Sequence, residues 1–210
     1  MNINTAFQGK VVKPWHDLNR WLAKPYALQP DLNDPLRMAA SLAIEIRHLP
    51  EKTSVDDKQA RANCFAQDVI RDVADSWKHG QLDQKSRDNH LSLTSDIEVA
   101  NGQFRFLRNC VLVEHATKGK HDLLDLCAQA IGFWVLQIGI TAEPLAIAEA
   151  PNDFNPMVVL YFDARYQVNM QAVRLRFFKR HEDGRLYPVD PVDCPVEILK
   201  AELLQRQVNS

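Results

Sequence analysis

The chain has 210 residues, which is enough for one large domain or two small ones with a sizeable buried core. Hydrophobic residues make up 46% and charged residues 25%, a composition that excludes an intrinsically disordered chain. The formal net charge of −2 gives no general attraction to polyanions, which argues against non-specific nucleic-acid binding by the whole surface.

The cysteine spacing and the apolar segments bear on the cellular compartment of the protein and on whether it enters a membrane. The four cysteines form no Cys-x-x-Cys pair, so neither a zinc ribbon nor a thioredoxin-like motif is present. The first 15 residues contain no apolar run of the kind found in signal peptides. The most apolar window, 123–140, includes Asp125, Gln129 and Gln137, and therefore predicts a buried helix and not a membrane span. We expect a cytoplasmic protein that does not enter a membrane.

Three helices are predicted in the first part of the chain. Proline suits a first helical turn, so the first short helix is expected to begin at Pro14. Asp34 can cap a second helix, which Pro50 stops. Apolar spacing predicts a third helix of about six turns from about Asp56 to His79, with Trp77 in the core.

Strand-like patterns follow these helices. Asn101-Gly102 between two apolar runs is a strong hairpin signal. An apolar helix from Asp122 to about Gly139 comes next. Further strands are predicted in "MVVLYFDA" (157–164), "AVRLRFFKR" (172–180) and "RLYPV" (185–189), and a C-terminal helix in "VEILKAELLQRQ" (196–207).

Helices first and strands later, without regular alternation, is an α+β pattern. We expect N-terminal helices and one central apolar helix packed on an antiparallel sheet of about four or five strands. Each half looks too small to bury its own apolar faces. The sequence therefore predicts a single α+β domain over residues 1–210, with a helical part at about 14–80 and a mixed part at about 91–206.

One candidate for chemistry lies at the end of the third predicted helix. Asp72, Asp75 and His79 share one face of it, where they could bind a divalent metal or provide general acid–base catalysis. An ordinary helix end also explains these residues, through an ion pair of Asp75 with Arg71 or Lys78, cations near the helix C-terminus and a glycine cap. The helix-end interpretation is favoured because it needs only common stop signals.

A second candidate is the Glu-x-x-His pair Glu45 and His48, which resembles half of a di-iron motif. No second Glu-x-x-His occurs in the chain. If the second and third helices formed an antiparallel hairpin, His48 and His79 would lie on the order of 30 Å apart. No common nucleotide, hydrolase or metal motif is present, so the cofactor stays unknown and no residue is assigned as a metal ligand.

The strand at 172–180 offers a third candidate. Arg174 and Arg176 lie on one face of it, and Arg105 of the hairpin could join them, giving a basic surface for a nucleotide or RNA. Such a polar face commonly points to water only. Asp163 and Glu114 on nearby strands would offset part of its charge.

These patterns favour a cytosolic, non-enzymatic binding or assembly protein. The reason for this prediction is the apolar helix surface at 131–140, which self-association in a homodimer would cover. The alternative is a metal-dependent or acid–base, nuclease-like enzyme that uses Asp72, Asp75 and His79. A further alternative is nucleotide or RNA binding through Arg105, Arg174 and Arg176.

Overall fold

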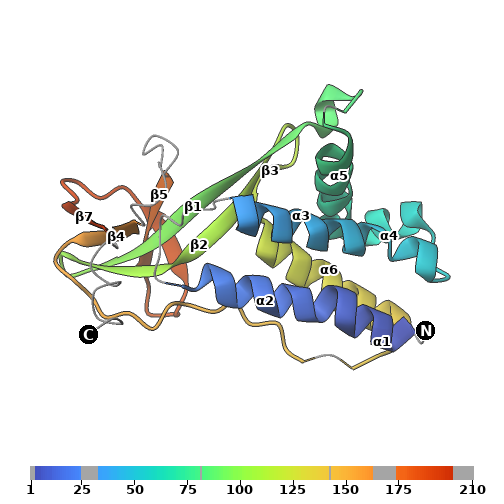
Figure 1. The fold of residues 1–210 in the computed structure, drawn as a ribbon, viewed down its shortest axis with the longest axis horizontal. Coiled ribbons are helices and arrows are strands. Elements are labelled where there is room, and N and C mark those ends of the chain that lie inside the picture. Colours follow the sequence, from blue (N-terminus) through green and yellow to red (C-terminus); the bar gives the residue numbers. More distant parts are fainter. Residues whose placement is uncertain (1–2, 25–32, 81, 142, 163–173, 201–210) are drawn as a thin grey trace, which may run out of the picture. The chain divides into compact units, whose positions relative to one another are not determined.

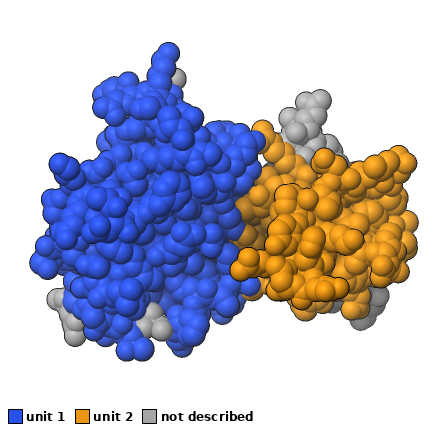
Figure 2. Space-filling model, turned by 180° about the vertical axis from the view of Figure 1, so that it is seen from behind, with its two compact units in different colours: residues 1–21, 33–92, 111–147 blue, residues 22–32, 93–110, 148–210 orange. Residues whose placement is uncertain are grey.

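The computed structural model describes residues 3–24, 33–80, 82–141, 143–162 and 174–200. It has helices and a five-stranded mixed sheet, which confirms the α+β class (Figure 1). The chain divides into two compact units (Figure 2). The helical unit comprises residues 1–21, 33–92 and 111–147, and the sheet unit comprises residues 22–32, 93–110 and 148–210. The single domain expected over 1–210 stays a prediction.

The elements follow one another with helices mainly before strands. The helical elements are α1 (Ile3–Phe7), η1 (Gln8–Val12), α2 (Lys13–Leu22), α3 (Asn33–Arg47), η2 (Pro50–Lys52), α4 (Asp57–Asn63), α5 (Phe65–His79), η3 (Lys85–Arg87) and α6 (Leu123–Ile138). The strands are β1 (Asn89–Ala100), β2 (Gln103–His115), β3 (Gly119–Asp122), β4 (Val158–Phe162), β5 (Arg174–Arg180), β6 (Leu186–Val189) and β7 (Val196–Lys200).

The first helix begins earlier than the sequence predicts. Elements α1, η1 and α2 follow each other without a break, so Pro14 lies inside a helical segment and does not start one. The turn before it is π-helical, and the Lys13 N–H donates to the Gln8 carbonyl five residues back. A proline disturbs the regular ladder upstream of its ring, and a wider π turn accommodates that disturbance.

The third predicted helix is two helices. Cys64 has extended backbone angles and separates α4 from α5, and the Asp56 side chain caps α4 by accepting from the Gln59 N–H at 3.1 Å. Neither proline nor glycine marks this break, so apolar spacing alone could not reveal it. The placement of Trp77 in the core is also wrong, because its side chain is 44% exposed near the end of α5.

Helix α6 is confirmed within one residue at each end. The Asp122 side chain caps it by accepting from the Leu124 N–H at 2.9 Å, and Gly139 ends it in a left-handed conformation. Two buried indoles fasten this helix to the rest of the helical unit. Trp134 of α6 donates to Gln67 of α5, and Trp15 of α2 donates to the Leu124 carbonyl, both at 2.9 Å.

The main sheet has the strand order β3-β2-β1-β5-β6. The predicted hairpin is confirmed, with Asn101 and Gly102 both at positive φ in the turn between β1 and β2. The sheet is mixed and not purely antiparallel, because β5 pairs in parallel with β1. In the sheet unit, an apolar cluster packs against these strands around Ile97, Phe104, Val158 and Leu160.

The C-terminal prediction is wrong where it can be compared. Residues 196–200 form strand β7, which pairs in parallel with β4 in a separate two-stranded sheet. The short apolar run at 196–200 is compatible with either a strand or a helix, and pairing with β4 stabilises the strand. The rest of that predicted helix, 201–207, lies outside the described residues, as do residues 163–164 and 172–173 of the predicted strands.

Candidate functional site

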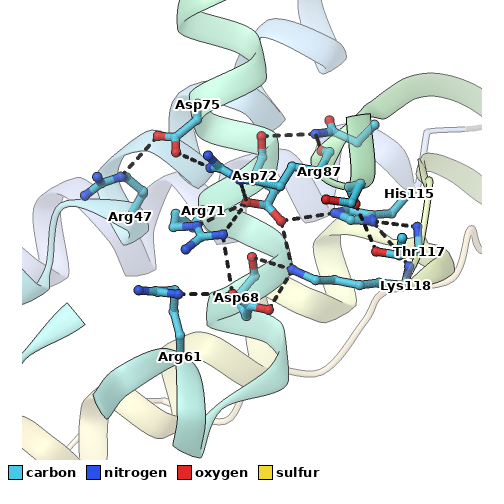
Figure 3. A network of polar contacts seen from close by, with 12 residues as sticks. Arg47, Arg61, Asp68, Arg71, Asp72, Asp75, Arg87, His115, Thr117 and Lys118 are labelled. Atoms are coloured by element: carbon cyan, nitrogen blue, oxygen red, sulfur yellow. Dashed lines mark hydrogen bonds and ion pairs between the residues drawn. The ribbon is translucent and has the colours of Figure 1, made fainter. Parts of the chain in front are cut away.

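Asp72, one of the predicted catalytic residues, lies at the centre of a polar network in the helical unit (Figure 3). Its side chain is only 1% exposed. Oδ1 accepts hydrogen bonds from Arg71 Nη2 and Arg87 Nε, each at 2.7 Å. Oδ2 lies 2.8 Å from Lys118 Nζ and 3.1 Å from His115 Nε2. Helix α5 is therefore tied to η3 and to the β2–β3 connection.

These donors decide the ionisation of Asp72. Burial alone would raise the pKa of this carboxyl, but hydrogen bonds from Lys118, Arg71, Arg87 and His115 outweigh burial and hold its pKa well below the usual range. The carboxylate is thus ionised at neutral pH, and both oxygens are occupied. An acid this strong is a poor proton acceptor, so the geometry favours a structural role.

His115 sits against Asp72 with its side chain fully buried. Its Nδ1 accepts from the backbone N–H groups of Thr117 and Lys118, both at 3.2 Å. Nδ1 therefore carries no proton, and the proton on Nε2 points to Asp72. The pair resembles an Asp–His dyad, but neither ring nitrogen is open to a substrate.

The neighbouring carboxylates are paired with cations in the same way. Asp75 lies 2.6 Å from Arg87 Nη2 and 3.3 Å from Arg47 Nε. Asp68 lies 2.6 Å from Lys118 Nζ. The Asp75 pairs expected from spacing, with Arg71 or Lys78, are replaced by these contacts with residues from other elements.

The third predicted catalytic residue, His79, is exposed in the last turn of α5. Gly80 follows it at φ +77°, and the Gly80 N–H donates to the Ser76 carbonyl, as at an ordinary helix end. Asp72 and Asp75 are thus joined through Arg87, while His79 lies outside this group. Within the described residues, no three His, Cys, Asp or Glu side chains gather in an arrangement that could hold a metal.

The Glu-x-x-His pair is engaged in surface contacts. Glu45 pairs with Lys52 at 3.3 Å, and His48 Nδ1 lies 2.8 Å from Glu51. The other nitrogen of His48 is within hydrogen-bond distance of Lys78, next to His79. The separation expected from a simple helical hairpin is therefore wrong, because the break at Cys64 lets α5 bring its C-terminal end to the end of α3.

In the sheet unit, Arg176 of the predicted basic face is paired with a buried carboxylate. Its Nε and Nη2 each lie 2.8 Å from the oxygens of Asp96 on β1, a bidentate contact. The guanidinium also stacks on the Phe178 ring, 5.4 Å from the centroid. Arg174 lies exposed at the start of β5.

A closed ring of two arginines and two glutamates occupies the same unit. Arg105 Nη2 lies 2.8 Å from Glu149, and Arg180 Nη2 lies 2.7 Å from it. Both arginines also bind the buried Glu98, at 3.1 Å through their Nε atoms. Burial would raise the pKa of Glu98, but the two guanidiniums lower it. This ring is electrically neutral.

Of the two charge partners predicted from the sequence, only Glu114 can be compared. Glu114 pairs with Lys120, and Asp163 lies outside the described residues. Among the described residues, Asp96 pairs with Arg176, and Glu98 and Glu149 pair with Arg105. The alternation of side chains along one strand could not identify Asp96 as a partner of Arg176, because the parallel pairing of β1 with β5 brings these two residues opposite each other.

The four cysteines are free thiols. Burial raises the pKa of Cys110 to about 11, and that of Cys127 further still. Both are protonated at neutral pH and behave as small apolar side chains.

One site was missed by sequence reasoning. A groove of about 1030 Å³ runs along α1, η1 and α2 in the helical unit, with His16 in its wall. The signal available in the sequence was Pro14, which marks an irregular turn once it is inside a helix. His16 itself has no partner motif in the sequence.

Comparison of the chain with protein-family models, with curated proteins and with solved structures finds no significant match. Within the described residues, no helix combines the length and apolar character that crossing a bilayer requires.

Proposed function

We propose that the protein is a non-enzymatic binding or assembly protein that acts as a homodimer through the apolar end of α6. The observation that carries this proposal is Leu136, whose side chain is 79% exposed in the last turns of that helix. Isolated exposed apolar residues are common, so the residues around Leu136 must show whether it belongs to an interaction surface.

One face of α6 changes character along its length. The exposed residues of its first turns are polar, and Gln129 donates to Asp125 at 2.9 Å. On the same side, Gly132 is exposed, and Phe133 is half-buried before Leu136. A Cβ added at Gly132 would meet no heavy atom within 4 Å, so the surface there is open to the backbone of a second helix.

A second copy of the chain is the simplest partner for this face. A two-fold axis near Gly132 and Leu136 would pack the helix against itself, and two-fold dimers are the commonest oligomers. The polar Asp125 and Gln129 would then lie at the rim, where interfaces are wet. The free thiols support including a cytoplasmic location in the proposal.

The pairing of the candidate catalytic groups supports a non-enzymatic role. Asp72, Asp75 and His115 are held by partners within the helical unit, and those contacts stabilise the fold. Arg105 and Arg176 are held similarly in the sheet unit. A nucleophile or base needs a free atom within reach of a substrate, and these groups present none.

Light scattering after size exclusion tests the proposal. The wild type is expected at the mass of a dimer, and Leu136→Gln at the mass of a monomer with unchanged circular dichroism. Val192→Gln removes an 87% exposed apolar side chain from the sheet unit and is the matched control that should stay dimeric. A wild type that remains monomeric at millimolar concentration would contradict the proposal.

A further inference from the structure

The groove in the helical unit lies between a helix and an extended segment. One wall is a single face of α1, η1 and α2, and the other includes Thr141 and Glu143, which follow α6. Residues 143–150 contain neither helix nor strand. The volume of about 1030 Å³ is at the upper end of the range, roughly 300–1,000 Å³, of small-molecule sites.

The segment is fastened to the helix on both sides of Glu143. Gln8 Nε2 donates to the Thr141 carbonyl at 3.4 Å, and Asn19 Nδ2 donates to the Ala146 carbonyl at 2.8 Å. These two clamps hold the backbone on both sides of Glu143 against the helix.

His16 is the unusual group in the groove wall. Its Nε2 is buried and has no hydrogen-bond partner among the described residues. The nearest carboxylate oxygen, from Glu143, is 4.0 Å away, too far for a hydrogen bond. The Glu143 side chain is itself 87% exposed, so little packing holds it in place. An acceptor group thus lies near His16 Nε2 without satisfying it, and a buried polar atom left in this state is costly.

Cations accompany His16 along the same helix face. Lys13, His16 and Arg20 follow each other at spacings of three and four, which places them on one side of α2. Arg20 is paired with Asp17. Lys13 is exposed and forms no ion pair with another described residue. Once the Glu143 side chain swings outward, this stretch of the groove carries a positive excess.

We propose that the groove binds a small organic carboxylate, which displaces the Glu143 side chain and accepts a hydrogen bond from His16 Nε2. Lys13 supplies the counter-charge. Glu143 acts as an internal substitute for the ligand carboxylate. The proposal is independent of α6 dimerisation.

Amide NMR of the full-length protein tests this site, with acetate, lactate and succinate as probes at constant ionic strength. Saturable shifts are expected for residues 8–20 and 143–147. Glu143→Gln should tighten binding about two- to fivefold, because it removes the competing carboxylate. Lys13→Ala, an exposed substitution that leaves the core intact, should weaken binding by a similar factor, and His16→Phe about tenfold.

Asp153→Asn, an exposed carboxylate of the sheet unit, is the control and should leave affinity unchanged. Weaker binding in Glu143→Gln would overturn the proposal, because it would mean that Glu143 attracts a cationic group of the ligand. The absence of saturable shifts with all three probes would also overturn it. Leu136→Gln should bind the probes like the wild type, so failure of the dimer and failure of this site are separate results.

Discussion

His115 and Asp72 form a buried pair in which the histidine Nε2 lies 3.1 Å from the carboxylate, while its Nδ1 accepts two backbone N–H groups. The two residues come from different segments, β2 and α5, and are shielded from solvent, as an acid–base pair would be. What separates this pair from a catalytic dyad is that every ring nitrogen and carboxylate oxygen already has a partner. The pair therefore stabilises the helical unit.

Asp72→Asn should lower the free energy of unfolding by about 1.5–3 kcal/mol, because it removes the buried carboxylate that the half-buried cations Arg71, Arg87 and Lys118 share. Urea unfolding measures this loss. Asp153→Asn, at an exposed position, should change the free energy by less than about 0.5 kcal/mol. Equal effects of the two substitutions would contradict the structural role of Asp72.

Acid should destabilise the wild type through the same carboxyl. The folded-state pKa of Asp72 lies below its unfolded value, so its contribution is complete above about pH 4 and is lost as the pH falls from there towards the folded pKa. For this one group the slope reaches at most about 1.4 kcal/mol per pH unit. Urea unfolding between about pH 5 and about pH 3 should show a shallower decline in Asp72→Asn. Parallel declines would mean that other carboxyls dominate acid unfolding.

A structural role and a nuclease-like role of Asp75 and His79 predict different results for metal content and nucleic-acid cleavage. If these residues only pair with cations and end a helix, the purified protein should contain no stoichiometric metal and should not cleave RNA or DNA in the presence of Mg²⁺, Mn²⁺ or Zn²⁺. Metal analysis and a gel-based cleavage assay measure this. Cleavage that disappears in both Asp75→Asn and His79→Ala, with folding intact, would make the enzyme the better account.

The predicted basic face should behave as an ion-paired surface. Arg176→Lys loses the bidentate contact with Asp96 and should reduce the free energy of unfolding by about 1–2 kcal/mol. Lys179→Arg, at an exposed position of the same strand, is the matched control and should have little effect. RNA binding at physiological salt that falls in Arg176→Lys and weakens steeply with added salt would instead support nucleic-acid recognition.

Local signals predicted those elements whose ends are set by their own residues. Asp122 and Gly139 bound α6, and Asn101-Gly102 makes the hairpin turn, because a cap or turn depends on a few adjacent residues. The break at Cys64 and the strand at Val196 depend on packing and on pairing with β4, which lie outside any local window. Pro14 does not start a helix, because a π turn accepts a proline inside one.

The candidate site shows the same division. Helical spacing placed Asp72 and Asp75 on one face of a helix correctly, but their partners Arg87 and Lys118 come from distant segments. Only the fold shows that these cations form ion pairs with the two carboxylates. His16 could not be singled out from the sequence, since the groove beside it depends on the clamps from Gln8 and Asn19.

Hydrogen–deuterium exchange at low and high protein concentration tests the homodimer most directly, because it locates the surface as well as detecting association. If α6 packs against its counterpart in a second copy, peptides covering 131–140 should exchange more slowly as concentration rises, while peptides covering 174–180 should not change. Leu136→Gln should abolish that dependence. Exchange in 131–140 that is the same at every concentration would contradict the dimer.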